Sequence, residues 1–238
     1  MSGEAFALIG LAVLLGALVQ SVVGIGLGLL VAPVTAMIYP AWVPVLPLLL
    51  AMLVSGVMLR GEWRRIEWRV LAWMLPARVP GTVVGVWLVV HFTEPQLAVA
   101  IAVMVLVGVL VSVRTAHVPV NPGTMVLAGL ASGAAGTATS VGGPPVALLL
   151  QNREAAQMRS TMAVFFFAGV LLSLAGLLIA GEVAASTARA ALVLAPLVVI
   201  GFWLGTRVRD RLPQHRLRIA VLATCSVAAT ALVVRALG

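Results

Sequence analysis

The residues best suited to chemistry lie in two glycine-rich segments of otherwise apolar sequence. TATSVGGPP (137–145) carries three hydroxyl side chains, two glycines and two adjacent prolines, which lack backbone N–H donors. QSVVGIGLG (20–28) carries an amide, a hydroxyl and three glycines. Each segment should break a helix and start a new one, and the N–H groups at a helix N-terminus favour anions. The expected chemistry is therefore anion binding.

Arg78 extends this predicted site, because it lies about nine residues into an apolar stretch, where a guanidinium usually faces a cavity or a partner. No Asp, Glu or His lies inside an apolar stretch to pair with it, so the ligand should bring the negative charge. The alternative is that Arg78 snorkels toward the cytoplasm. The predicted substrate-binding residues are Gln20, Ser21, Gly24, Gly26, Gly28, Arg78, Thr137, Thr139, Ser140, Gly142, Gly143 and Pro144.

A simpler interpretation of the glycines is close packing between helices. Gly129, Gly133 and Gly136 fit that interpretation, whereas the double proline after Gly143 favours a binding site. Enzyme motifs are missing: there is no H-E-x-x-H, and no intramembrane His that could activate Ser140. GIGLG lacks the strand and acidic residue of a dinucleotide site. We therefore expect no enzyme, cofactor or metal, and the single cysteine excludes an intramolecular disulfide.

The composition indicates a membrane protein. Soluble domains carry about 25% charged residues, whereas this chain of 238 residues has 9% charged and 62% hydrophobic. Repeated apolar stretches of at least 17 residues predict an all-α polytopic membrane protein. The net charge of +8 comes from Arg mostly in short loops, which orients spans and does not indicate nucleic acid. We expect a multi-pass protein of the bacterial inner (plasma) membrane, with the lipid bilayer and a small anion as partners and a homodimer left open.

The chain is interpreted as two repeats, residues 1–118 and 119–238. GIGLGLLVA aligns with SVGGPPVAL, which begins 116 positions later at Ser140. The pattern P-x4-G-x3-G occurs at Pro76 and again 120 positions later at Pro196. Each repeat is expected to hold one broken segment and three helices: 5–38, about 41–59, 70–90 and 97–113, then 123–151, about 161–181, 187–206 and 217–234.

Equivalent loops of the two repeats carry opposite charge biases. Residues 60–69 hold four Arg and their counterpart 180–189 holds one, whereas residues 88–97 hold none and 207–218 hold five. Arg-rich loops face the cytoplasm. Equivalent loops should therefore face opposite sides, which is the signature of an inverted-topology repeat.

Inversion requires an odd number of crossings per repeat, so one of the four apolar stretches must cross an even number of times. The candidates are 5–38 and 123–151, because the first would be about 51 Å long as one helix against about 30 Å of hydrocarbon. We expect both to be re-entrant, the first dipping from outside and the second from the cytoplasm. Broken backbone at membrane depth needs protein or an aqueous cavity around it. The two tips should therefore meet near the midplane and form the site.

The second broken segment and its continuation resemble a known family. SVGGPPVALLLQNR (140–153) and QMRSTMAVFFFAGVLLSLAGLLIAGEV (157–183) are similar to the second half of the TauE/SafE family, also called the sulfite exporter or TSUP family. GLAVLLGALVQSVVGIGLGLLVAPV (10–34) resembles the first-half counterpart. The likeness covers essentially the whole chain. It implies outward transport of sulfur-containing anions such as sulfite, thiosulfate, sulfoacetate or other organosulfonates.

The first half departs from the family pattern in two places. Leu27 separates Gly26 from Gly28, where the family often has consecutive glycines, and no Arg corresponds to Arg159 of the second half. These departures concern the substrate more than the family.

The predicted function is export of a small sulfur-containing anion by six spanning helices and two re-entrant hairpins. Without intramembrane carboxylates a proton relay is disfavoured, whereas membrane potential can drive anion efflux directly, and sodium coupling stays open. One alternative is a channel-like uniporter for a neutral or cationic solute. Another is a non-transporting assembly or sensor subunit, in which the glycines only pack helices.

Overall fold

The computed structural model describes residues 3–59, 65–113, 118–208 and Thr230, and all regular structure in these ranges is helical. Because these ranges contain no strand, the predicted all-α class is confirmed for them. The helices are α1 Gly3–Val23, α2 Leu27–Ile38, the 3-10 turn η1 Pro40–Trp42, α3 Val45–Leu59, α4 Trp68–His91, α5 Glu94–Val113, α6 Pro122–Thr139, α7 Gly143–Leu150, α8 Ala155–Ile179 and α9 Ala185–Val208.

Two helix breaks separate α1 from α2 and α6 from α7. At the first break Gly24 and Gly26 have φ angles of 93° and 155°, which glycine adopts without the steric cost of a Cβ. At the second break Ser140 occupies the left-handed region, with φ 62°. α2 and α7 begin at Leu27 and Gly143, which are 116 positions apart (143 − 27). The offset found in the sequence therefore aligns the two breaks.

Four described helices, α1, α4, α8 and α9, are long and apolar enough to cross a membrane. Their outward faces carry large exposed apolar side chains such as Leu8, Val83, Ile179 and Leu192, which suit contact with lipid rather than water. α2 and α7 are about 18 Å and 12 Å long, too short to cross alone.

The length of α1, about 31 Å, would allow it to cross the whole hydrocarbon layer. The re-entrant path of 5–38 and 123–151 therefore stays a prediction. The predicted helix 217–234 lies outside the described residues.

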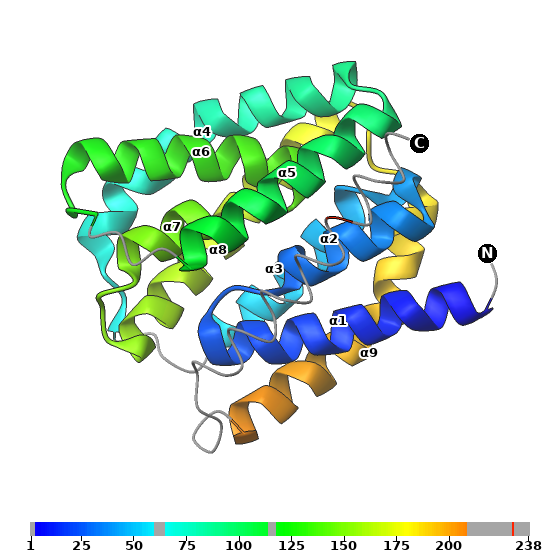
Figure 1. Cartoon of the computed structure of the whole chain (residues 1–238), viewed down its shortest axis with the longest axis horizontal. Helices are drawn as coiled ribbons and strands as arrows, with labels where there is room; N and C mark the ends of the chain where they lie inside the picture. The colour runs from blue at the N-terminus through cyan, green and yellow to red at the C-terminus, as the bar shows by residue number, and fades with distance from the viewer. Residues whose placement is uncertain (1–2, 60–64, 114–117, 209–229, 231–238) are drawn as a thin grey trace.

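The main helix contacts join opposite halves of the chain. α4 packs on α6 and α9 packs on α1, while α3 and α8 contact each other between these two pairs (Figure 1). In Figure 1, α4 and α6 run away from the end at the left, and α1 and α9 run toward it.

Glycines bring the backbones of these pairs together at corresponding positions. Gly81 of α4 lies against the carbonyl oxygen of Leu130, and Gly201 of α9 lies against that of Leu14. The two glycines are 120 positions apart (201 − 81), and the two leucines are 116 apart (130 − 14). A Cβ at either glycine would overlap the facing carbonyl, so the absence of a side chain permits this approach. The pattern P-x4-G-x3-G thus marks the same contact twice.

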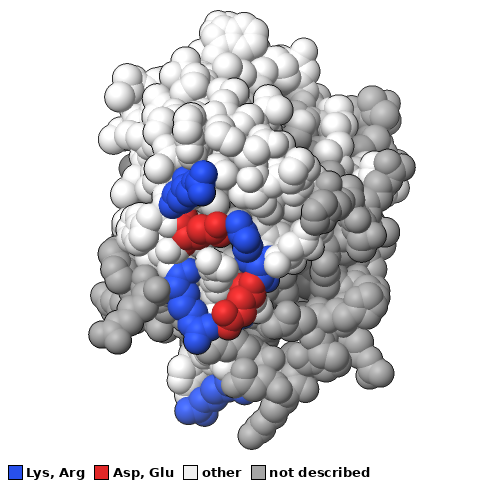
Figure 2. Space-filling view, turned by 90° about the vertical axis from the view of Figure 1, so that its left-hand side faces the viewer, with Lys and Arg blue, Asp and Glu red and all other residues white. Residues whose placement is uncertain are grey.

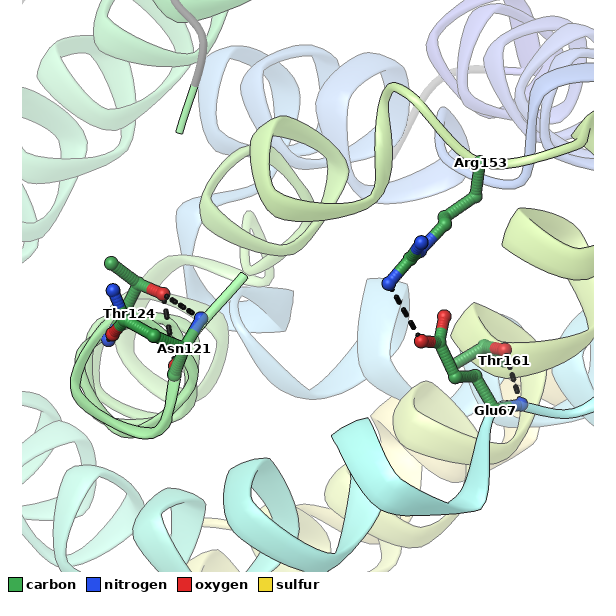
Figure 3. Close-up of polar contacts among 5 residues, drawn as sticks. All are labelled: Glu67, Asn121, Thr124, Arg153 and Thr161. Atoms are coloured by element: carbon green, nitrogen blue, oxygen red, sulfur yellow. Dashed lines mark hydrogen bonds and ion pairs between the residues drawn. The ribbon is translucent and has the colours of Figure 1, made fainter. Parts of the chain in front are cut away.

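One end of the molecule gathers charged side chains of both signs on its surface (Figure 2). Ion pairs join Arg65 to Glu154 and Arg153 to Glu67, the second at 2.8 Å. The backbone N–H of Glu67 donates to the Thr161 hydroxyl at 3.0 Å (Figure 3). These contacts fasten the segment at the start of α4, in the first half, to α8 and to the connection between α7 and α8 in the second.

The N-terminus of α6 is capped reciprocally near the same end. Thr124 donates its backbone N–H to the Asn121 side chain at 3.0 Å, and Asn121 donates its backbone N–H to the Thr124 hydroxyl at 3.1 Å (Figure 3). Such a capping box satisfies N–H groups that have no partner inside the helix. It fixes where α6 begins, 18 residues before the second break.

We expect Gly81→Ala to lower the free energy of unfolding by about 1–3 kcal/mol, because the new methyl group overlaps the Leu130 carbonyl. Gly201→Ala should do the same at the corresponding contact. The measurement is thermal unfolding of the purified full chain in detergent. Gly3→Ala is the matched control, since a Cβ there meets nothing within 4 Å. Equal unfolding temperatures for Gly81→Ala and Gly3→Ala would contradict the packing role.

Candidate functional site

The two helix breaks meet around a cavity of about 40 Å³. Gly28 lies against the carbonyl oxygen of Ser140, and a Cβ on Gly143 would lie 3.0 Å from a methyl carbon of Ile25. The two segments of the sequence that suggested a site are thus in direct contact. The cavity is lined by Gln20, Ile25, Gly26, Gly28, Leu29, Leu48, Ala51, Arg78, Gly136, Ser140, Val141, Gly142, Gly143, Phe166 and Val170.

Arg78 lies near the middle of α4 and reaches this cavity with 1% of its surface exposed. The alternative that it snorkels to the cytoplasmic surface is therefore wrong. One guanidinium nitrogen, Nη1, donates to the Ser132 hydroxyl at 3.2 Å, and the guanidinium carbon lies 4.7 Å from the centre of the Phe165 ring. No acidic side chain pairs with it in the described part of the chain, and its Nε has no hydrogen-bond partner there.

The position of the guanidinium depends on two glycines. Gly169 of α8 lies directly against Nε and Cζ of Arg78, so a Cβ there would overlap the guanidinium. A Cβ on Gly136 of α6 would lie 3.3 Å from Nη2. α6 and α8 thus leave space for one large charged side chain. At position 78 only Arg would fill that space with both a positive charge and a planar set of N–H donors.

Ser132 connects Arg78 to the second break. Its hydroxyl accepts from Arg78 and donates to the carbonyl oxygen of Gly142 at 2.6 Å. The Ser140 hydroxyl donates to the carbonyl oxygen of Pro44 at 2.8 Å, which ties the same break to the start of α3. Ser132 thus supplies a hydrogen bond to the broken backbone, and Ser140 joins that backbone to a neighbouring helix.

Gln20 serves the first break in a comparable way. Its side-chain oxygen accepts from the backbone N–H of Leu27 at 3.2 Å, and its side-chain nitrogen donates to the Ser55 hydroxyl at 3.4 Å. The first N–H of α2 is therefore already bonded within the protein. In α7 the second and third positions are Pro144 and Pro145, which have no N–H to offer. The helix N-termini thus provide fewer donors to a ligand than the sequence suggested.

Seven of the twelve residues predicted to bind substrate line the cavity, and five do not. The seven are Gln20, Gly26, Gly28, Arg78, Ser140, Gly142 and Gly143. The other five have contacts elsewhere. The hydroxyl groups of Ser21 and Thr139 donate to carbonyl oxygens of their own helices, Leu18 O and Ala135 O, each at 2.7 Å, and the Thr137 hydroxyl pairs with Ser173 at 2.8 Å. Gly24 packs on Arg159 and Met162, and Pro144 is buried at the start of α7.

Several residues of the site were missed from the sequence. Ile25 and Val141 occupy the centres of the two breaks, 116 positions apart, and Phe166 and Val170 add an apolar wall from α8. Ser132 could have been found, because it lies four residues before Gly136 and therefore on the same face of α6. The apolar residues carry no such signal, since they match the surrounding sequence.

The described residues hold no group of three His, Cys, Asp or Glu side chains placed to bind a metal ion.

Each break joins the C-terminus of one helix to the N-terminus of the next, so opposite dipole ends meet there. The formal charge of the cavity is therefore that of Arg78.

Comparison with known proteins gives one finding. A family model described as Sulfite exporter TauE/SafE matches residues 8–232, nearly the whole chain. No curated protein and no solved structure matches.

We expect Ser132→Ala to lower the free energy of unfolding by about 1–3 kcal/mol, because it leaves Arg78 Nη1 and the Gly142 carbonyl buried without this partner. Thr206→Ala is the matched control, because that hydroxyl only donates to Trp203 O within its own helix. Its unfolding free energy should change by less than about 0.5 kcal/mol. Thermal unfolding in detergent measures both, and identical shifts would argue that Ser132 has no bridging role.

Proposed function

The chain belongs to the sulfite exporter TauE/SafE family, and on that premise we propose that it exports a small sulfur-containing anion, sulfite or an organosulfonate such as sulfoacetate. The route runs through the cavity between the two breaks, across a bacterial inner membrane. The observation that carries this proposal is the buried guanidinium of Arg78, which lines the cavity and has no acidic partner among the described residues.

A buried charge without a counter-ion is costly, because the desolvation penalty is not offset by an attraction inside the protein. An anion in the cavity provides that attraction and can accept hydrogen bonds from the guanidinium, whose fork of N–H donors can bond two oxygens of one oxyanion. A cation would be repelled, and a neutral solute would leave the charge uncompensated. The cavity therefore favours an anion over the solutes of the alternative uniporter.

The packing supports an inverted repeat as the transport framework. α4 and α9, which are aligned at an offset of 120, run in opposite directions (Figure 1). Their glycines make corresponding contacts with helices of the other half. Carriers built this way hold substrate between the repeats and expose it to each side in turn by rocking one repeat against the other.

The charged end of the molecule fits the cytoplasmic side of this framework, because Arg-rich connections face the cytoplasm. Arg65–Glu154 and Arg153–Glu67 hold segments of the two halves together there. We infer that these pairs separate when the cavity opens to the cytoplasm. A negative interior potential then drives the anion outward without a relay of carboxylates.

We expect Arg78→Gln to lower the initial rate of sulfite uptake at low concentration by at least about thirtyfold, because the substrate loses its buried counter-charge. The measurement is uptake of radiolabelled sulfite into proteoliposomes containing the purified full chain. Arg189→Gln is the matched control, since Arg189 is exposed near the start of α9 and donates to Ala185 O of its own helix.

Unchanged uptake by a folded Arg78→Gln protein would remove Arg78 from the site. Absence of saturable uptake by the unaltered protein would favour the alternative, an assembly or sensor subunit that does not transport. An unchanged unfolding temperature is the check that each variant is folded.

The proposed inversion predicts opposite sidedness for two equivalent positions. Arg69 and Arg189 are 120 positions apart, and both are exposed. In a Cys225→Ser background, Arg69→Cys should react with a membrane-impermeant maleimide only after permeabilisation, and Arg189→Cys should react in intact cells. Labelling of both from one side would show that the repeats are parallel.

A further inference from the structure

The described residues give the cavity around Arg78 a single formal charge. Among those of them that line it, only Arg78 is ionisable, and the polar ones, Gln20 and Ser140, are neutral. Of the elements packed around it, α2, α3, α6 and α7 carry no charged or titratable side chain. On the others, Glu4, Arg69 and His91 are exposed near helix ends.

Arg159 of α8 is the nearest candidate for a second positive charge. It is 7% exposed and packs against Gly24 at the first break. It is not among the residues that line the cavity. An anion next to Arg78 therefore meets one guanidinium directly.

The helix ends do not add a second unit of positive charge. A helix N-terminus is worth about half a positive charge, and a C-terminus about half a negative one. Since each break brings one of each to the same place, their contributions oppose one another. In addition, the first N–H of α2 is taken by Gln20, and Pro144 and Pro145 remove two donors from α7.

The size of the cavity also limits the ligand. A volume of about 40 Å³ is space for about three water-sized groups. A compact oxyanion fits such a space better than an anion with a second charged arm. Apolar walls from α3 and α8 provide no donors that would solvate a second negative charge.

We propose that this site selects compact monoanions over dianions, so that sulfite is carried as bisulfite, HSO₃⁻. The inference rests on the proposed function, because it assigns a charge state to the substrate of the same cavity. A monoanion and Arg78 form a neutral pair, whereas a dianion leaves a net negative charge buried in a low dielectric. Among the proposed substrates, sulfoacetate, a dianion, should therefore be carried less well than bisulfite.

The test compares anions of fixed and variable charge in proteoliposomes of the purified full chain, with equal pH on both sides and a clamped membrane potential. Bisulfite loses its proton near neutral pH, and methanesulfonate is a monoanion throughout. The half-saturating concentration of total sulfite should rise about tenfold per pH unit above the second pKa of sulfite, while that of methanesulfonate stays constant. Arg78 stays protonated over this range, so it contributes no pH dependence.

Competition against labelled methanesulfonate gives a second measurement at one pH. Sulfate and thiosulfate, both dianions, should compete at least about tenfold more weakly than unlabelled methanesulfonate. Gln20→Glu provides a charge-cancelling variant, since its carboxylate can still accept from the Leu27 N–H. It should abolish saturable uptake of methanesulfonate, whereas the same change at Gln96, which is exposed and does not line the cavity, should retain it.

Equal competition by sulfate, or a half-saturating sulfite concentration that does not change with pH, would overturn the charge selection and leave the proposed transport intact. Absence of saturable uptake of both sulfite and methanesulfonate would overturn the proposed transport, and the charge selection with it. Uptake by protein-free vesicles is subtracted throughout.

Discussion

A guanidinium held inside an apolar bundle, with no acidic partner in the described part of the chain, constrains this structure more than any other feature. Its charge is withdrawn from bulk water, because Arg78 is almost fully buried, and it cannot be neutralised by loss of a proton. The protein supplies partial compensation through one hydroxyl and one aromatic face, from Ser132 and Phe165. The positive charge that these groups do not compensate can attract an anion. The surrounding helices hold the guanidinium beside the small cavity.

Close backbone approach is what makes this arrangement possible. Glycines on α4 and α9 lie against carbonyl oxygens of α6 and α1, so the long helices of each half hold the broken helices of the other. Gly169 then leaves room for the guanidinium itself. Small residues thus have two uses here, helix packing and clearance for the Arg78 side chain, and both depend on the absence of a Cβ. The packing interpretation of the glycines is therefore confirmed at these contacts, and the binding interpretation stays a prediction.

The hydroxyl and amide side chains near the breaks mainly satisfy the protein itself. Ser132 and Gln20 bond to backbone groups of the two breaks, the Gly142 carbonyl and the Leu27 N–H, whereas Ser140 bonds to the Pro44 carbonyl at the start of α3. In a bilayer such groups cannot turn to water, so nearby side chains must serve them. This explains why the polar residues cluster where the helices break. Thr137 and Thr139 do not line the cavity. The Thr137 hydroxyl pairs with Ser173 of α8, and the Thr139 hydroxyl donates to Ala135 O of α6 and accepts from the Val141 N–H of the second break.

The sequence by itself determined the helical class, the positions of both breaks, the two offsets and the place of one Arg inside an apolar stretch, but it left open whether that side chain is buried. These follow from local chemistry: glycine and proline interrupt helices, apolar stretches seek lipid, and a charge amid them needs a partner. Only the tertiary structure decided which residues meet in the cavity, because that depends on helix rotation and on contacts such as Gly28 with Ser140 across 112 positions (140 − 28). Apolar wall residues such as Phe166 look like any lipid-facing residue until packing shows which way they point.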